Sequence, residues 1–199
     1  MKSLDSITRL SGDHLIGNEA FTYHGEETDM TILEYWRWLY SELFDLQSSI
    51  AEYIVAKALG LKKAYNVGDW TLFDIEYRSK RIEVKETSYV HAWQTDEEPK
   101  SKTRAFGINK AHDTYQDSTS ELHRQNDIYV FCLNTGETRK TANPLQLEHW
   151  EFYIVPTSLI NEKCGDANSI SLSRLRKMTP VVPYPEIKAN IDAIIDNEG

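Results

Sequence analysis

Three charged residues, Asp74, Glu83 and Lys85, interrupt the alternating apolar pattern of the stretch LFDIEYRSKRIEVKE. Glu83 and Lys85 are two positions apart, so on a strand their side chains point to the same face. A hard cation such as Mg²⁺ takes oxygen ligands and keeps several waters, so two carboxylates and a phosphate oxygen suffice to bind it. An ammonium on that face can hold the attacking water and offset negative charge that develops during the reaction. These residue types and spacings indicate a site for a divalent cation and a phosphate ester.

Two strands with a polar turn must position these residues. DWTLFDIEY and RIEVKETSYV, separated by RSK, read as a β-hairpin. With the turn centred on Ser79 and Lys80, Asp74 lies opposite Lys85 and is a diagonal neighbour of Glu83, at roughly 7–8 Å between backbones. A slip of one residue would place the two acids on opposite faces. The site therefore depends on the hairpin register.

The rest of the chain predicts one α/β domain over residues 1–199, with a mixed central sheet and helices on both of its faces. Residues 1–30 are polar and are expected to be irregular. The polar segment 109–126 has no clear period and is expected to be a loop near a site. The apolar patterns predict helices over 31–44, 48–60, 169–178 and 185–196, and strands over 104–108, 127–133 and 150–157.

Composition bounds the class of protein. Of 199 residues, 40% are hydrophobic and 11% aromatic, which is enough for a sizeable core. No apolar run approaches the roughly 20 residues of a membrane span, and the start, MKSLDSITRL, lacks the apolar block of a secretory signal. Cys132 lies within the apolar run IYVFCL and is expected to be a small buried side chain. The expected compartment is the reducing cytoplasm.

The net charge of -9 argues against a general binder of polyanions, because phosphate contacts need Lys and Arg. It leaves room for one local basic patch. A cation-binding site also adds acidic residues of its own. Zinc is disfavoured, since the histidines lack H-x-x-H and H-E-x-x-H spacings.

Asp74, eight intervening residues and then Glu83-Val84-Lys85, preceded by Glu52 on a helix, resemble the PD-(D/E)XK nuclease superfamily, which has the restriction-endonuclease-like fold. The resemblance covers roughly residues 47–133. It is carried by AEYIVAKALG, RIEVKETSYVHAWQ and DIYVFCL, which look like a bacterial branch of the superfamily. One departure is Phe73, which precedes Asp74 where the motif has Pro; that Pro is commonly absent in the superfamily.

The resemblance implies a metal-dependent nuclease. Asp74, Glu83 and the carbonyl of Val84 would bind Mg²⁺ or Mn²⁺, and Lys85 would lie near the nucleophilic water. The expected reaction is hydrolysis of DNA phosphodiester bonds by in-line attack of a metal-activated water. By family analogy alone, a homodimer would be expected for cutting both strands.

The same resemblance assigns Glu52 as an outer acidic residue and Gln94 as a polar residue beside the site. Glu52 has a second interpretation, because SIAE from Ser49 is a capping box in which Glu52 would reach back to the Ser49 amide. Gln94 could orient a water or contact a phosphate, and it could equally be an ordinary loop amide.

Lys100, Lys102 and Arg104 form the densest basic stretch outside the hairpin. Along a cleft they would contact nucleic-acid phosphates; on a solvated strand edge they would have no ligand.

An E-x-K on a strand is common by itself, so two other functions stay open. One is a non-catalytic module that binds nucleic acid or protein on the same fold, and the other is an enzyme acting on a different phosphate ester.

Overall fold

The computed structural model describes residues 17–39, 47–61, 72–91, 104–112, 119–138 and 141–198. Contacts divide the chain into two compact units, Met1–Leu43 and Phe44–Gly199. The prediction treated residues 1–199 as a single domain. All residues of the predicted site belong to the larger unit, Phe44–Gly199.

The smaller unit contains a hairpin and a helix. β1 (Ala20–Tyr23) pairs antiparallel with β2 (Glu26–Thr31), and α2 (Ile32–Leu39) follows directly. The expectation of an irregular segment over 1–30 is therefore wrong for residues 20–30. The strands expose most of their side chains, so the sequence carries no apolar alternation that would have indicated them.

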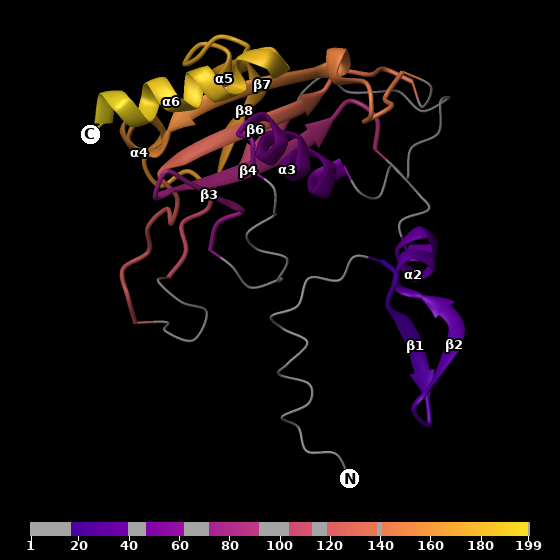
Figure 1. The fold of residues 1–199 in the computed structure, drawn as a ribbon. Coiled ribbons are helices and arrows are strands. Elements are labelled where there is room, and N and C mark those ends of the chain that lie inside the picture. Colours follow the sequence, from indigo (N-terminus) through magenta and orange to yellow (C-terminus); the bar gives the residue numbers. More distant parts are fainter. Residues whose placement is uncertain are drawn as a thin grey trace. The chain divides into compact units, whose positions relative to one another are not determined.

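A four-stranded mixed sheet organises the larger unit. Its order is β3 (Ile75–Tyr77), β4 (Lys80–Ser88), β6 (Ile128–Asn134) and β7 (Trp150–Pro156), side by side in Figure 1. β4 and β6 are parallel, whereas the outer pairs β3–β4 and β6–β7 are antiparallel. Every residue of β6 is buried, as its continuous apolar sequence predicts. The mixed sheet is confirmed.

Helices cover both faces of this sheet, as predicted. On one face, α3 (Gln47–Ala58) and α6 (Ile187–Glu198) pack against β4, β6 and β7 through side chains such as Val55, Val84 and Ile191. On the other face lie α4 (Thr157–Cys164), α5 (Leu172–Leu175) and a small antiparallel pair of β5 (Ala105–Gly107) with β8 (Ser169–Ser171). The short 3₁₀ helices η2 (Leu147–His149) and η3 (Tyr184–Glu186) precede β7 and α6.

Two elements differ from the prediction. Residues 169–178 do not form one helix, because the strand β8 precedes the four-residue α5; Ile170 is opposite Phe106, and Ser171 caps α5 by accepting the amide of Arg174. The helix α4 was not predicted. It follows Pro156 and ends at Gly165, whose φ of 54° suits a glycine.

The end of α3 agrees with the sequence. Gly60 has a φ of 76° and donates to the Lys57 carbonyl, while Leu61 donates to the Ala56 carbonyl. This pair of bonds is the Schellman arrangement that a glycine after a helix favours. α3 and α6 have 12 residues each, and across the described ranges no helix has both the length and the apolar character needed to cross a membrane.

Candidate active site

The β3–β4 turn is one residue earlier than predicted. Tyr77 is opposite Lys80 and Ile75 is opposite Ile82, so the two turn residues are Arg78 and Ser79, with φ of 51° and 60°. Two consecutive residues of positive φ form the turn whose twist matches that of a hairpin. The predicted register, with the turn at Ser79 and Lys80, is therefore wrong. The sequence lacks the Asn-Gly or Asp-Gly pair that would have marked the position.

The corrected register keeps the acids on a common side of the hairpin. Each β3 residue faces a β4 residue two positions earlier than predicted, and an even shift preserves the alternation of faces. Asp74 stands just before the first paired residue of β3. Its amide donates to the Ile82 carbonyl at 3.1 Å, and its carboxylate accepts the Val84 amide at 2.7 Å. The carboxylate of Asp74 thus extends the ladder before the start of β3.

This contact also locates the carbonyl of Val84. The amide and carbonyl of one strand residue point to the same side, and the Val84 amide points to the β3 side, where it meets Asp74. The Val84 carbonyl therefore points to the part of the β4 edge that β3 does not cover, before the start of β3. The side chain of Val84 is buried in the core, on the face of the sheet that α3 covers. A backbone oxygen and a carboxylate lie next to each other at this edge.

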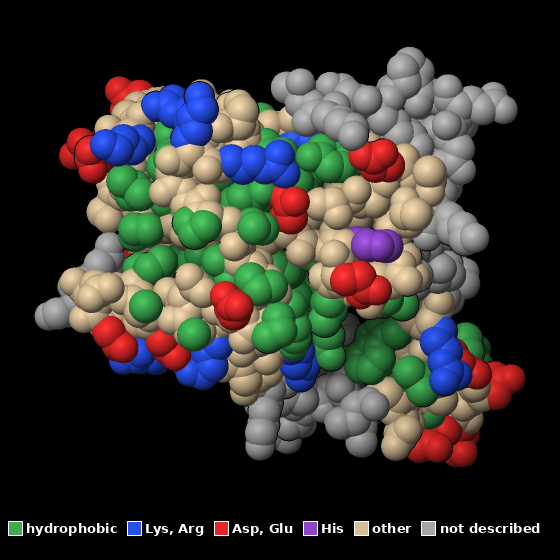
Figure 2. All heavy atoms as spheres, turned by 90° about the horizontal axis from the view of Figure 1, so that it is seen from above, with side chains coloured by type: hydrophobic (Ala, Val, Ile, Leu, Met, Phe, Trp, Pro, Cys, Tyr) green, Lys and Arg blue, Asp and Glu red, His purple; other side chains and the backbone are tan. Residues whose placement is uncertain are grey.

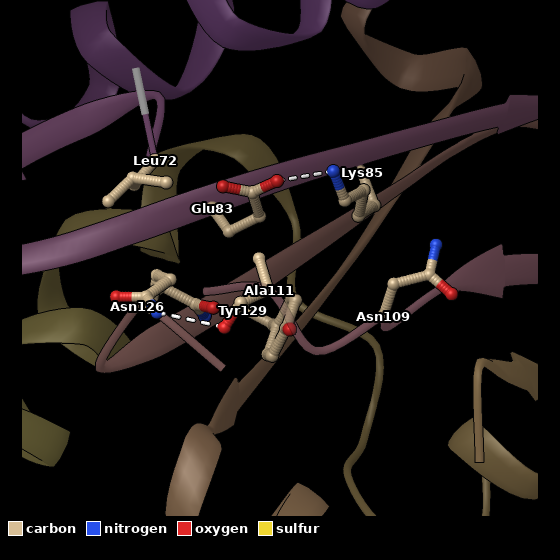
Figure 3. A pocket seen from close by; sticks show the side chains of 8 residues that line it. Leu72, Glu83, Lys85, Asn109, Ala111, Asn126 and Tyr129 are labelled. Carbon is tan, nitrogen blue, oxygen red and sulfur yellow. Dashed lines mark hydrogen bonds and ion pairs between the residues drawn. The ribbon is translucent and has the colours of Figure 1, made fainter. Parts of the chain in front are cut away.

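Glu83 and Lys85 point to the same face of β4, as predicted. Both are half-buried, and the Lys85 ammonium forms an ion pair with Oε1 of Glu83, drawn as a dashed line in Figure 3. Burial raises the pKa of Glu83 from its ordinary value, and Asp74 raises it further, while Lys85 acts in the opposite direction. The carboxylates of Asp74 and Glu83 are thus close enough to repel each other.

Glu52 joins this cluster from α3. Burial raises its pKa to about 7, with further contributions from the charges of Asp74 and Glu83, and Lys85 lowers it in part. The capping-box interpretation is wrong, because α3 already includes Gln47 and Ser49 therefore lies inside the helix. The structure places Glu52 within the electrostatic reach of Asp74 and Glu83.

Asp74 has the same electrostatic character. Its pKa is raised chiefly by burial, against the lowering effects of the Val84 amide and of Lys85. Glu52, Asp74 and Glu83 therefore share one partly buried region with a single ammonium nearby. Within the described part of the chain, however, no three His, Cys, Asp or Glu side chains converge closely enough to form a metal-binding group by themselves.

A pocket of about 160 Å³ opens beside Glu83 and Lys85. Figure 3 shows these two side chains across the pocket from Ala111, Asn126 and Tyr129. Tyr129 is 2% exposed, and burial raises its pKa to about 12, so it is a neutral phenol. The lining residues are Leu72, Glu83, Lys85, Asn109, Ala111, Gln125, Asn126 and Tyr129.

Arg124 fixes the backbone around this pocket. It is 5% exposed, and its guanidinium donates to the carbonyls of Ile108, Gly165 and Ala167. It also donates to Oδ1 of Asn161 at 2.6 Å. A buried guanidinium needs this many acceptors. Through these bonds, Arg124 ties the pocket segments before β6 and after β5 to the end of α4.

Four lining residues were not predicted as site residues: Asn109, Gln125, Asn126 and Tyr129. A loop near a site was predicted over 109–126, and the polar run RQND directly before the buried strand β6 was the available signal. Tyr129 read only as a core residue of that strand. Tyr129 lines the pocket because β4 and β6 are neighbours, with Glu83 opposite Tyr129.

The remaining predicted residues divide into two groups. Gln94, Lys100 and Lys102 lie outside the described residues. Arg104 donates to the carbonyls of Ser88 and Tyr89 at 2.5 and 2.9 Å, and its guanidinium lies over the Tyr89 ring. These contacts hold the end of β4 against the start of β5 and give Arg104 a structural role.

The sequence matches no protein-family model and no curated protein.

Proposed function

We propose that the protein is a nuclease of restriction-endonuclease-like fold that hydrolyses DNA phosphodiester bonds with Mg²⁺ or Mn²⁺. The observation that carries this proposal is the electrostatics of the hairpin site. The pKa values of Glu52, Asp74 and Glu83 are all raised, by burial and, for Glu52 and Glu83, by the neighbouring acids. A bound divalent cation would relieve that repulsion, which gives the arrangement a physical reason.

The donor set suits a hard cation. Asp74 and Glu83 offer carboxylate oxygens, and the Val84 carbonyl points to the same edge. Two carboxylates and a carbonyl leave coordination positions for water and a phosphate oxygen, as Mg²⁺ prefers. The cation would polarise the phosphoryl group and lower the pKa of a bound water. Glu52 would lie outside this set of ligands and contribute to the net charge of the site.

Lys85 would act on the water and on the developing charge. Its ammonium already reaches the Glu83 carboxylate, so it lies where a nucleophile bound beside Glu83 would be oriented. A cation there would also stabilise negative charge on the phosphoryl oxygens in the transition state.

DNA as the substrate rests on the resemblance of Asp74 and Glu83-Val84-Lys85 to the nuclease motif. The face shown in Figure 2 has hydrophobic side chains between scattered acidic and basic ones, with no broad basic surface among its described residues. With a net charge of -9, we expect phosphate contacts to be local, and Lys100 and Lys102 stay candidates for them. A cytoplasmic location and a homodimer belong to the same proposal.

The test is cleavage of plasmid and linear DNA in Mg²⁺, Mn²⁺ or EDTA. We expect native protein to cut with either metal and not in EDTA, and Lys85→Ala to lose roughly 100-fold or more in rate, as loss of one transition-state charge contact typically does. Lys163→Ala is the matched control, since Lys163 is an exposed lysine on α4 that pairs only with its neighbour Glu162 in the described structure. It should cut like native protein.

Other outcomes would reassign the protein. Equal cleavage by native protein and Lys85→Ala would point to a contaminant or another site. Binding of DNA that needs no metal and leads to no cleavage would assign a non-catalytic module. If DNA is neither bound nor cut, a panel of small phosphate esters tests hydrolysis of another substrate.

A further inference from the structure

The pocket beside Glu83 and Lys85 has the size of one aromatic ring. Its volume is about 160 Å³, close to the roughly 150 Å³ cavity that holds a single benzene. Leu72 and Ala111 contribute apolar surface, while three carboxamides contribute polar atoms. A base pair would not fit in this space, but a single six-membered ring would.

The amide of Asn126 has one possible orientation. Its Nδ2 donates to the Ile128 carbonyl and to Oγ1 of Thr157, both at 3.0 Å. Because a carbonyl can only accept, the atom that faces Ile128 must be the nitrogen. The remaining polar atom of Asn126 is therefore its oxygen, an acceptor. The residue is 8% exposed and lines the pocket, so a ligand there can reach it.

Gln125 repeats this arrangement. Its Nε2 donates to the Ala111 carbonyl at 3.1 Å, which again fixes the nitrogen and leaves the amide oxygen as the available acceptor. Gln125 is 9% exposed. Asn109, also part of the lining, is exposed. Two buried amides thus present acceptor oxygens in the pocket that Glu83 and Lys85 also line, and a ligand that matches these two amides donates hydrogen bonds to them.

We propose that this pocket binds one unpaired nucleobase with an exocyclic amino group, cytosine by its size, from a nucleotide next to the scissile phosphate. The inference rests on the proposed function, since Glu83 and Lys85 belong to both the pocket and the reaction centre. The amino group would donate to the amide oxygens of Gln125 and Asn126. Thymine has the same ring size but presents a carbonyl oxygen at that position, which would leave these acceptors unpaired.

An unpaired base is required because a paired one has its amino group engaged with its complement. The substrate would be single-stranded DNA, or a duplex from which one nucleotide is extruded. The protein would then prefer cytosine at one position beside the cut.

The experiment compares 12-residue oligonucleotides of dC and dT, which have equal charge and length. Fluorescence anisotropy in EDTA measures the binding of each to the full-length protein, and a parallel reaction in Mg²⁺ measures cleavage. We expect dC to bind about tenfold more tightly than dT, the effect of roughly one good hydrogen bond. Gln125→Met, which keeps the side-chain length without the amide, should bring the ratio below about threefold.

Two controls keep this test decisive. Gln146→Met removes the amide of an exposed glutamine outside the pocket and should leave the ratio unchanged. Leu72→Trp gives a second pocket variant, which fills the pocket from a half-buried position, in case Gln125→Met unfolds on heating at a lower temperature than native protein. It should also reduce the preference for dC.

The outcomes separate this inference from the proposed function. Equal binding of dC and dT, or no binding of either, overturns the base pocket. If native protein nevertheless cuts DNA in Mg²⁺ and Lys85→Ala does not, the nuclease function stands without the base pocket. A preference for dC that survives Gln125→Met and Leu72→Trp would also reject the pocket, because recognition would then come from other residues.

Discussion

Glu83 and Glu86 are three residues apart on β4 and point to opposite faces of the strand. Glu83 faces the pocket with Lys85. Glu86 lies opposite the fully buried Cys132, and its Oε1 is buried without a hydrogen-bond partner among the described residues. Burial raises the pKa of Glu86 to about 7. The same residue type is thus a site acid in one position and a destabilising group in the other.

The substitution Glu86→Gln tests this difference through the pH dependence of stability. A carboxyl with a folded pKa of about 7 and an ordinary unfolded pKa retains its proton in the folded state between about pH 4.5 and 7. The folded state binds more protons than the unfolded state there, so the free energy of unfolding falls as pH rises through this window. At pH 4 both states are protonated, and the penalty is absent.

We expect Glu86→Gln to raise the free energy of unfolding by about 1–3 kcal/mol at pH 8 and to change it little at pH 4. Urea unfolding at both pH values, in EDTA, measures the difference. Glu76→Gln on β3 is the control, since Glu76 is exposed and its loss should matter little at either pH. A native protein and a Glu86→Gln variant of equal stability at pH 8 would show that Glu86 finds a partner in solution.

At the scale of elements, the hairpin turn shows how tertiary contacts select a register. Arg78 and Ser79 both have positive φ, which costs roughly 1 kcal/mol or more for a residue other than glycine. Arg78 forms ion pairs with Asp192 and Asp196 on α6, at 3.1 and 2.7 Å, and the Tyr77 hydroxyl donates to Asp192. The turn is therefore held by a helix more than 100 residues later in the chain.

Ser79→Gly should relieve the strain of this turn. A glycine adopts positive φ without steric cost, so we expect the free energy of unfolding to rise by about 0.5–1 kcal/mol, partly offset by the entropy of the unfolded chain. Ser79→Ala keeps the strain and is the matched control, without a gain. Denaturant unfolding of both variants measures this. A loss of stability in Ser79→Gly would contradict the turn geometry at this position.

The turn also explains why the register could not be predicted although the hairpin could. Alternating apolar residues identified both strands, and Gly60 identified the end of α3 by its local preference for positive φ. Arg78 and Ser79 carry no such local preference. Their conformation depends on α6, and contacts that distant in sequence leave no mark in the hairpin itself.

At the scale of the whole molecule, the acidic site should lower the free energy of unfolding of the metal-free protein, and a bound cation should restore it. Without a cation, the mutual repulsion and burial of the site carboxyls oppose folding at neutral pH, as their raised pKa values indicate. A cation that binds only the folded state would stabilise it by mass action. Such opposing demands on stability and activity are common at functional sites.

Thermal unfolding of native protein and Asp74→Asn, each in Mg²⁺ and in EDTA at pH 8, tests this relation. We expect Mg²⁺ to stabilise native protein by about 1–3 kcal/mol at saturating concentration. Asp74→Asn should be more stable than native protein in EDTA, because its amide oxygen can still accept the Val84 amide without the buried charge. It should gain little from Mg²⁺.

Glu186→Gln is the control for this experiment, since Glu186 is an exposed acid of η3 outside the site. It should retain the full Mg²⁺ effect. A native protein whose unfolding temperature is the same with Mg²⁺, Mn²⁺ and EDTA would remove the support for a cation at Asp74 and Glu83.

The sequence by itself determined which residues share a face and which elements carry them. Alternation along β4 puts Glu83 and Lys85 together, and the continuous apolar run of β6 predicts a strand buried on both faces. These are local properties with a fixed period, so they can be read from neighbouring residues.

Only the tertiary structure decided what surrounds those residues. It brought Glu52 from α3 to Asp74 and Glu83, assigned Arg104 to backbone carbonyls, and built a pocket from segments before β3, after β5 and before β6. Burial and the electric field of distant charges set the pKa values of the acids. Both depend on chain segments far apart in sequence, and no local pattern encodes their meeting.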